Sequence, residues 1–236
     1  MVVLKEGLTT IRSDAFNGKV RITSVEFAGS ITHIDSDETY GAFYDCHSMS
    51  SLMLQKTSIV SIGDRAFHFC SGITTATLPP ILKTIGDLSV FMCTSLKSIV
   101  LLPCVETVGD GVFMNCCSLE KVDICSVIPI TTGNKSFKGC NSLKSIQITS
   151  LESIGEEAFA CCGALTHINL PSSTKEIGKR AFYFCHSLKS VKLSHPLTSI
   201  GEDSFGACIS LPVSKMECNI PNDEFKALVA SSRNNE

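Results

Sequence analysis

A phenylalanine returns along this chain at nearly constant spacing, and the residues around it return with it. Its positions are Phe16, Phe43, Phe67, Val90, Phe113, Phe137, Phe159, Phe182 and Phe205, with Val90 replacing the ring in the fourth unit. The first gap is 27 residues, and all later gaps are 22 to 24 residues. A period in this range is the sequence signature of a solenoid, in which each unit buries its apolar side against the next unit.

Other residue types keep the same register as the phenylalanine. Glycine stands four residues before it, at Gly63, Gly86, Gly109, Gly133, Gly155, Gly178 and Gly201. Cysteine stands three residues after it, at Cys46, Cys70, Cys93, Cys116, Cys140, Cys162, Cys185 and Cys208. Aliphatic residues recur six, nine and eleven residues after it, so the apolar side of every unit is specified in the same way.

Each unit has the same predicted local structure. The segment Leu-x-x-Val-x-Leu, as in residues 188–193, alternates at its end and predicts a short strand. A turn and a second apolar stretch follow, such as residues 197–200. The glycine then indicates a tight or positive-φ turn, and Ala-Phe-x-x-Cys predicts a helical or 3₁₀ turn on the far side. The predicted fold is a mainly β repeat solenoid, a leucine-rich-repeat arc of about nine coils, in one domain over residues 1–216.

The run Ile-Gly-Lys-Arg-Ala-Phe-Tyr-Phe-Cys-His-Ser-Leu-Lys-Ser-Val-Lys-Leu, residues 177–193, resembles the repeat of BspA-like (treponemal-type) leucine-rich-repeat proteins. The resemblance covers roughly residues 4–216. It implies adhesion or protein recognition and brings no catalytic residue with it, because the repeat has none.

Charge and hydropathy exclude some classes of function. The net charge is −3 and no block of like charges occurs, which argues against a nucleic-acid binder. No apolar run has the roughly 18 to 20 residues of a membrane-spanning helix. The N-terminal residues show no secretory signal pattern. We therefore expect a cytoplasmic protein, with the cell surface as the alternative.

The cysteines allow several hypotheses. The favoured one is a buried column of small apolar side chains, whose free thiols indicate a reducing compartment. A metal site near Cys116, Cys117, Cys140, Cys161 and Cys162 is an alternative, as is a Cys–His nucleophile pair involving His47 or His186. Asp64, Asp87 and Asp110 follow column glycines, and they either bind calcium or cap the following helical turn. No cofactor is predicted.

A protein-binding surface is predicted on the strands. Residues eight and ten positions after the phenylalanine should face solvent, since side chains alternate along a strand. These two columns vary most in their second half. The predicted contacts are Lys121, Asp123, Gln147, His167, Asn169 and Lys192. An insertion in the second unit, carrying Asp35, Asp37, Glu38 and Tyr40, is a second candidate.

The two ends have different predicted roles. Residues 217–236 are expected to form a C-terminal cap helix and tail, with Phe225, Leu228 and Val229 on one helix face. Val2, Val3 and Leu4 start the repeat with no polar cap, which predicts self-association or a partner at that edge. The predicted function is a non-enzymatic protein-interaction module, a scaffold or assembly component. The alternatives are a BspA-type surface adhesin and a cysteine-based redox or metal-binding protein.

Overall fold

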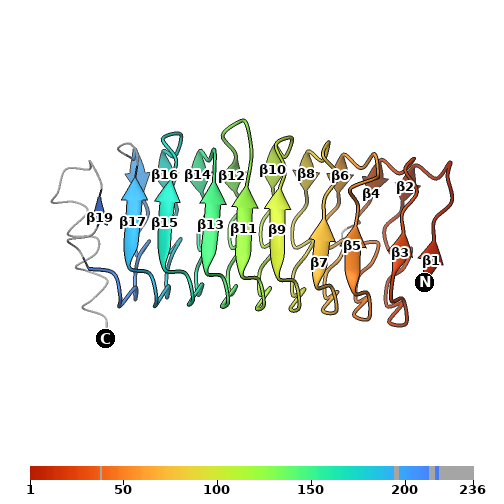
Figure 1. The fold of residues 1–236 in the computed structure, drawn as a ribbon, viewed down its shortest axis with the longest axis horizontal. Coiled ribbons are helices and arrows are strands. Elements are labelled where there is room, and N and C mark those ends of the chain that lie inside the picture. The colour runs from red at the N-terminus through yellow and green to blue at the C-terminus, as the bar shows by residue number, and fades with distance from the viewer. Residues whose placement is uncertain (38, 194–196, 213–215, 218–236) are drawn as a thin grey trace.

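The chain winds into a rod of stacked coils, with strands lying side by side along its length (Figure 1). The computed structural model describes residues 1–37, 39–193, 197–212 and 216–217. Each coil contributes one strand to one side of the rod and a second strand, two residues long, to another side. The prediction of a mainly β repeat solenoid is therefore confirmed. The predicted C-terminal cap helix lies outside the described residues.

The strands fall into an odd-numbered and an even-numbered set. The odd strands are β1 (Val2–Val3), β3 (Val25–Glu26), β5 (Ser51–Met53), β7 (Thr75–Thr77), β9 (Ser98–Leu101), β11 (Lys121–Ile124), β13 (Ser145–Ile148), β15 (His167–Leu170), β17 (Ser190–Leu193) and β19 (Met216–Glu217). The even strands are β2 (Thr10–Ile11), β4 (His33–Ile34), β6 (Ser61–Ile62), β8 (Thr84–Ile85), β10 (Thr107–Val108), β12 (Thr131–Thr132), β14 (Ser153–Ile154), β16 (Glu176–Ile177) and β18 (Ser199–Ile200).

All pairing between these strands is parallel, because every coil runs in the same direction as its neighbour. The even strands form one nine-stranded sheet in chain order. The odd strands form four separate ladders: β1-β3, β5-β7, β9-β11-β13 and β15-β17-β19. Single backbone hydrogen bonds join successive ladders, such as Lys97 N to Thr74 O at 3.3 Å and Ala164 N to Asn141 O at 3.1 Å. The whole rod is thus laterally hydrogen-bonded.

The turn that carries the phenylalanine forms a third lateral ladder. In the third coil, the amides of Arg65, Phe67 and Phe69 donate to Asp87 O, Ser89 O and Phe91 O of the next coil at 2.7 to 2.9 Å. Arg65 and Phe69 have φ of +52° and +60°, and residues in the same two registers repeat this conformation along the rod.

The prediction of a helical or 3₁₀ turn is wrong, since the described residues there form hydrogen-bonded turns without a regular helix. A helix would direct successive amides along its own axis. The left-handed residues instead turn every second amide toward the next coil.

The interior is built around the stacked phenylalanines. Phe137, Phe159 and Phe182 are fully buried, and consecutive rings lie 5.1 to 5.3 Å apart, within 7° of parallel. This spacing is close to the separation of hydrogen-bonded strands, about 4.8 Å. Each ring therefore covers the ring of the next coil, and the stack extends along the rod in step with the strands of the sheets. Its break lies at Val90, where the column has no ring.

The glycine column is required because neighbouring coils lie very close together there, and not because its members adopt a positive φ. None of its seven members has a φ in the left-handed region. A Cβ at Gly155 would lie 2.7 Å from the carbonyl group of Gly133 in the preceding coil, and a Cβ at Gly178 would lie 2.7 Å from Glu156 N. Real Cβ atoms do not approach backbone atoms this closely, so any larger residue must push two coils apart. The prediction that these glycines are needed for a positive φ is therefore wrong.

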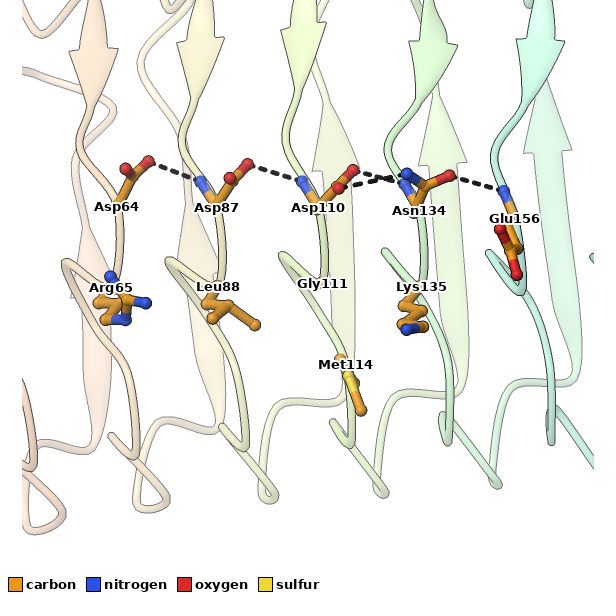
Figure 2. Close-up of a pocket in the computed structure, with 10 residues that line it drawn as sticks. All are labelled: Asp64, Arg65, Asp87, Leu88, Asp110, Gly111, Met114, Asn134, Lys135 and Glu156. Carbon is orange, nitrogen blue, oxygen red and sulfur yellow. Dashed lines mark hydrogen bonds between the residues drawn. The ribbon is translucent and has the colours of Figure 1, made fainter. Parts of the chain in front are cut away.

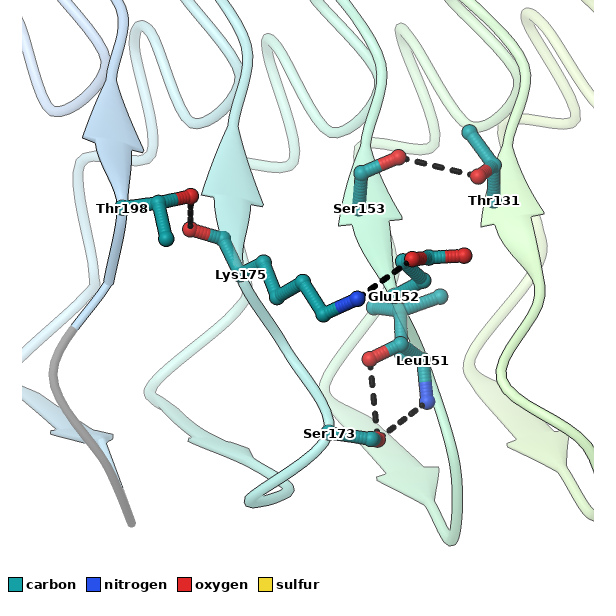
Figure 3. Close-up of polar contacts among 7 residues, drawn as sticks. All are labelled: Thr131, Leu151, Glu152, Ser153, Ser173, Lys175 and Thr198. Atoms are coloured by element: carbon teal, nitrogen blue, oxygen red, sulfur yellow. Dashed lines mark hydrogen bonds and ion pairs between the residues drawn. The ribbon is translucent and has the colours of Figure 1, made fainter.

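Polar side chains add coil-to-coil contacts beside the even-numbered sheet (Figure 3). Lys175 Nζ lies 2.8 Å from Glu152 Oε1, and Ser153 Oγ donates to Thr131 Oγ1 at 2.9 Å. Ser173 Oγ accepts from Leu151 N at 3.0 Å and donates to Leu151 O at 2.9 Å. Each contact joins residues about one repeat apart, so it links one coil directly to the next.

Candidate interaction surface and the buried thiols

The solvent-facing side of the odd strands, here called the odd-strand face, consists of the residues eight and ten positions after each phenylalanine. Along β9, β11, β15 and β17 the inward residues are buried and the outward ones are exposed or half-buried. The alternation follows the pleat of a strand. The sequence therefore placed these two columns on the correct face.

All six predicted contact residues lie on this face. Lys121, Gln147, His167, Asn169 and Lys192 are exposed, and Asp123 is half-buried. Backbone register sets Asp123 beside Gln147 and Asn169 beside Lys192. The residues thus form two neighbouring groups, one on β11 and β13 and one on β15 and β17. Whether they bind a partner stays a prediction.

Asp123 is the most distinctive of these side chains. Its Oδ2 accepts from Lys121 Nζ at 2.8 Å, whereas its Oδ1 is buried and has no hydrogen-bond partner. A buried polar atom without a partner costs free energy, about 1–3 kcal/mol when a buried group is left unsatisfied. Because Oδ1 is closed to solvent, the Lys121–Asp123 ion pair is the part of this group that a bound molecule can contact.

The predicted buried cysteine column is present, and it has a polar function as well. All eight column cysteines are buried. Each thiol donates to the backbone carbonyl of the phenylalanine-register residue one coil earlier, as in Cys140 Sγ to Phe113 O at 3.2 Å and Cys162 Sγ to Phe137 O at 3.3 Å. The thiol is small enough for the interior and still supplies a weak donor. Both properties favour cysteine over alanine at this register.

Burial suppresses the acidity of these thiols. It raises the pKa of Cys46 to about 11 and that of Cys116 to about 12, and it raises the pKa of Cys140 well above the ordinary value. The hypothesis of a Cys–His nucleophile pair is not supported by the contacts. Cys46 Sγ donates to Phe16 O, while His47 Nδ1 lies 3.4 Å from Asp45 Oδ1. Among the described residues, no three metal-ligating side chains are placed to hold an ion.

A thiol-labelling experiment should separate the cysteines by position. The exposed Cys104 and Cys117 should react with iodoacetamide within minutes, because their side chains meet solvent. Column members such as Cys140 and Cys162 should react at least about 100-fold more slowly until urea unfolds the chain, since reaction needs the thiolate. Peptide mapping by mass spectrometry reads both classes in one sample. Rapid native labelling of Cys140 would contradict the stacked interior.

The aspartates that follow the column glycines form a ladder along one edge of the rod (Figure 2). Asp64 Oδ1 accepts from Asp87 N, and Asp87 Oδ1 accepts from Asp110 N, both at 2.8 Å. Asp110 and Asn134 continue the pattern toward Glu156 N. The prediction that these side chains cap the following turn of their own coil is therefore wrong. Each side chain instead accepts from a backbone amide of the next coil. These side chains border a shallow cavity of about 360 Å³.

An aromatic cluster on the turn side was missed in the sequence. Tyr44 stacks on His68 with ring centroids 4.9 Å apart, and His68 stacks on Phe91 at 4.5 Å. Phe69 meets His68 edge-on at 4.5 Å, and Tyr40 from the insertion meets Tyr44 edge-on at 5.3 Å. The signal was the run of aromatic residues one or two positions after the phenylalanine in three successive coils.

Parallel coils, a stacked phenylalanine interior and solvent-facing strand columns define a leucine-rich-repeat solenoid. The pattern described as the BspA type leucine rich repeat region matches residues 9–132 and 128–228, with six copies. The chain belongs to this family. None of the curated proteins compared with it matches significantly. Within the described residues, no helix is long and apolar enough to cross a membrane.

Solved structures show the same fold. A leucine-rich repeat protein from Bacteroides ovatus is 28% identical, with a TM-score of 0.62 over 89% of this chain and 58% of that one. The pneumococcal vaccine antigen PcpA is 22% identical, with a TM-score of 0.57 over 89% of this chain and 60% of that one. The chain thus spans about three fifths of the length of each of these two structures.

Proposed function

We propose that this protein is a non-enzymatic interaction module that binds another protein through its odd-strand face, as a scaffold or assembly component. The observation that carries the proposal is the outward row of polar side chains on that face, in which the Lys121–Asp123 ion pair lies beside Gln147. Charged and amide side chains held in one register favour partners with complementary charge and hydrogen-bonding groups over other proteins.

The surroundings of Asp123 support the same proposal. Val100 lies beside it in register and is 40% exposed, so an apolar contact adjoins the polar one. Gln147, Asn169 and Lys192 extend the polar surface toward the C-terminal coils. Solenoids commonly bind partners along such extended faces. An apolar spot beside hydrogen-bonding groups is typical of an interaction site.

The test is quantitative affinity capture from the native source, with variants matched by position. Asp123→Ala combined with Asn169→Ala alters the odd-strand face. Thr107→Ala combined with Thr131→Ala alters exposed residues of the even-numbered sheet. We expect a specific set of proteins to be captured by wild type and by the even-sheet variant, and to fall at least about tenfold for the odd-strand variant. Equal capture by all three proteins would contradict the proposal.

Self-association through the first coil is a second part of the proposal. Met1, Val3 and Val20 are exposed apolar residues, and a groove of about 620 Å³ lies between the N-terminal strand and the first turn. β1 and β2 each pair on one side, so their other edges present unpaired backbone groups. Sedimentation velocity at increasing concentration should show a dimer, and Val3→Lys should abolish it. A monomer at all concentrations would exclude this part.

We further propose a cytoplasmic location. The support is the column of eight buried cysteines, since unpaired thiols persist in reducing compartments. Fractionation of the native source should recover the protein with cytosolic markers. Recovery with the cell surface would instead favour the adhesin alternative.

A further inference from the structure

The aromatic cluster of the second to fourth coils consists of Tyr40, Tyr44, His68, Phe69 and Phe91. Unlike the buried phenylalanine stack, most of this cluster is accessible to solvent. Tyr40 is 41% exposed, and Tyr44, Phe69 and Phe91 are half-buried. Further along the rod, the register one position after the phenylalanine holds Met114, Lys138 and Ala160. The fold therefore does not require aromatic rings there, and their clustering points to recognition.

The eighth coil shows what a ring in this register can bind. The guanidinium of Arg180 lies over the ring of Tyr183, with Cζ 5.4 Å from the ring centroid. Arg180 Nε also lies 3.6 Å from Asp203 Oδ2. An arginine thus lies against an aromatic face and a carboxylate at once, an arrangement that stabilises a guanidinium by cation–π and ionic attraction.

The second coil has the same ring without the arginine. Tyr44 corresponds to Tyr183, whereas the register of Arg180 is occupied by Gly41, which presents no side chain. A Cβ at Gly41 would collide with the backbone of Arg65 and Ala66, so the glycine is required by the neighbouring coil. Tyr44 therefore has no arginine of its own coil in that register.

Carboxylates border this end of the cluster. Asp45 follows Tyr44 directly and has a side chain that is 46% exposed. Asp37 holds the insertion in place, since its Oδ1 accepts from the amides of Thr39 and Tyr40 at 2.7 and 2.8 Å. These backbone hydrogen bonds lower the pKa of Asp37, so it carries negative charge. Aromatic faces next to carboxylates are complementary to a cationic side chain.

Buried His68 adds an unsatisfied atom to the cluster. It is 8% exposed, and its Nδ1 is buried without a hydrogen-bond partner. Burial, followed by the positive charge of Arg65, lowers the pKa of His68, so the ring is neutral near pH 7. Arg65 adjoins His68 and disfavours a second cation there. The part of the cluster that solvent reaches at this end is exposed Tyr40 and half-buried Tyr44, and a bound cation would lie there.

We propose that the aromatic cluster binds an arginine-containing basic segment of a partner protein, with a guanidinium placed on Tyr44 beside Asp45. This surface lies on the phenylalanine turns and is separate from the odd-strand face. The inference therefore does not depend on the proposed function.

The probe is a fluorescein-labelled peptide of alternating arginine and glycine, compared with a peptide that has citrulline in place of arginine. Fluorescence anisotropy at about 0.15 M salt should show tighter binding of the arginine peptide. Tyr44→Ala should weaken that binding about 3- to 10-fold, the size expected for one cation–π contact. Tyr44→Phe should retain it, since the ring is kept, and Asp45→Asn should weaken it.

The matched control is Tyr183→Ala, which removes a tyrosine in the same register whose ring Arg180 already covers. It should leave peptide binding unchanged, as should the odd-strand variant Asp123→Ala. Urea midpoints verify that each variant is folded. Equal binding of the arginine and citrulline peptides would overturn the proposal, and so would equal effects of Tyr44→Ala and Tyr183→Ala. A dimer that Tyr44→Ala dissociates, without peptide binding, would assign the cluster to a second copy instead.

Discussion

Replacing Phe182 with alanine is expected to lower the free energy of unfolding by about 3–5 kcal/mol. The ring is fully buried and lies between Phe159 and Phe205, with centroid distances of 5.3 and 5.2 Å. Its removal leaves a cavity that the stacked coils cannot close, because hydrogen bonds on three sides fix their separation. Urea titration followed by circular dichroism measures the loss.

The control for this prediction lies in the same coil. Phe184 is 40% exposed and contacts Tyr183 and His186 at its edge. Phe184→Ala removes the same atoms from a solvent-exposed position and should change stability by no more than about 1 kcal/mol. Stability can differ from coil to coil in a solenoid, so the two substitutions are compared at sites in the same coil. Equal losses at the two sites would mean that the ring stack does not carry the core.

The second large effect is expected at the glycine column. Gly155→Ala should destabilise the protein by about 1–3 kcal/mol or more, the usual cost of forcing extra atoms into a packed interior. The added Cβ would lie 2.7 Å from the carbonyl carbon and oxygen of Gly133 and from Thr132 O. None of these backbone atoms can move without breaking lateral hydrogen bonds. The midpoint of urea unfolding should therefore fall clearly.

Gly163→Ala is the matched change, eight residues later in the same coil. A Cβ there meets nothing within 4 Å, and the φ of Gly163 is outside the left-handed region. Alanine should stabilise the protein slightly, by about 0.4–1 kcal/mol, since it restricts the unfolded chain. If Gly155→Ala were as well tolerated as Gly163→Ala, the inference that the glycine column is required by close contact between coils would be wrong.

Residue columns in the sequence were sufficient to predict most of the fold. The spacing of Phe137, Phe159 and Phe182 gave the stacked interior, and the alternation in residues 121–124 gave the outward position of Lys121 and Asp123. These predictions hold because one repeat length forces equivalent residues into equivalent places. The sequence did not predict the turn geometry, since Arg65 and Phe69 are not residue types that favour a positive φ.

Side-chain partners across coils were less predictable. The amide that donates to Asp64 belongs to the next coil, whereas the sequence suggested a local cap because caps usually bind their own turn. The aromatic cluster was missed for a related reason. Tyr40 and Tyr44 come from an irregular unit, and their meeting with His68 depends on how the insertion folds back through the Ser36–Gly41 bridge.

What the sequence determined by itself was the repeat and its buried registers, because hydrophobic periodicity depends on residue type and spacing alone. Tertiary structure decided which atoms meet when one coil lies against the next. The glycine column is required by backbone contact, the cysteine column donates to phenylalanine carbonyls, and alternate turn amides pair laterally. The physical reason is that these interactions join residues a full repeat apart, and their distances exist only once the coils are stacked.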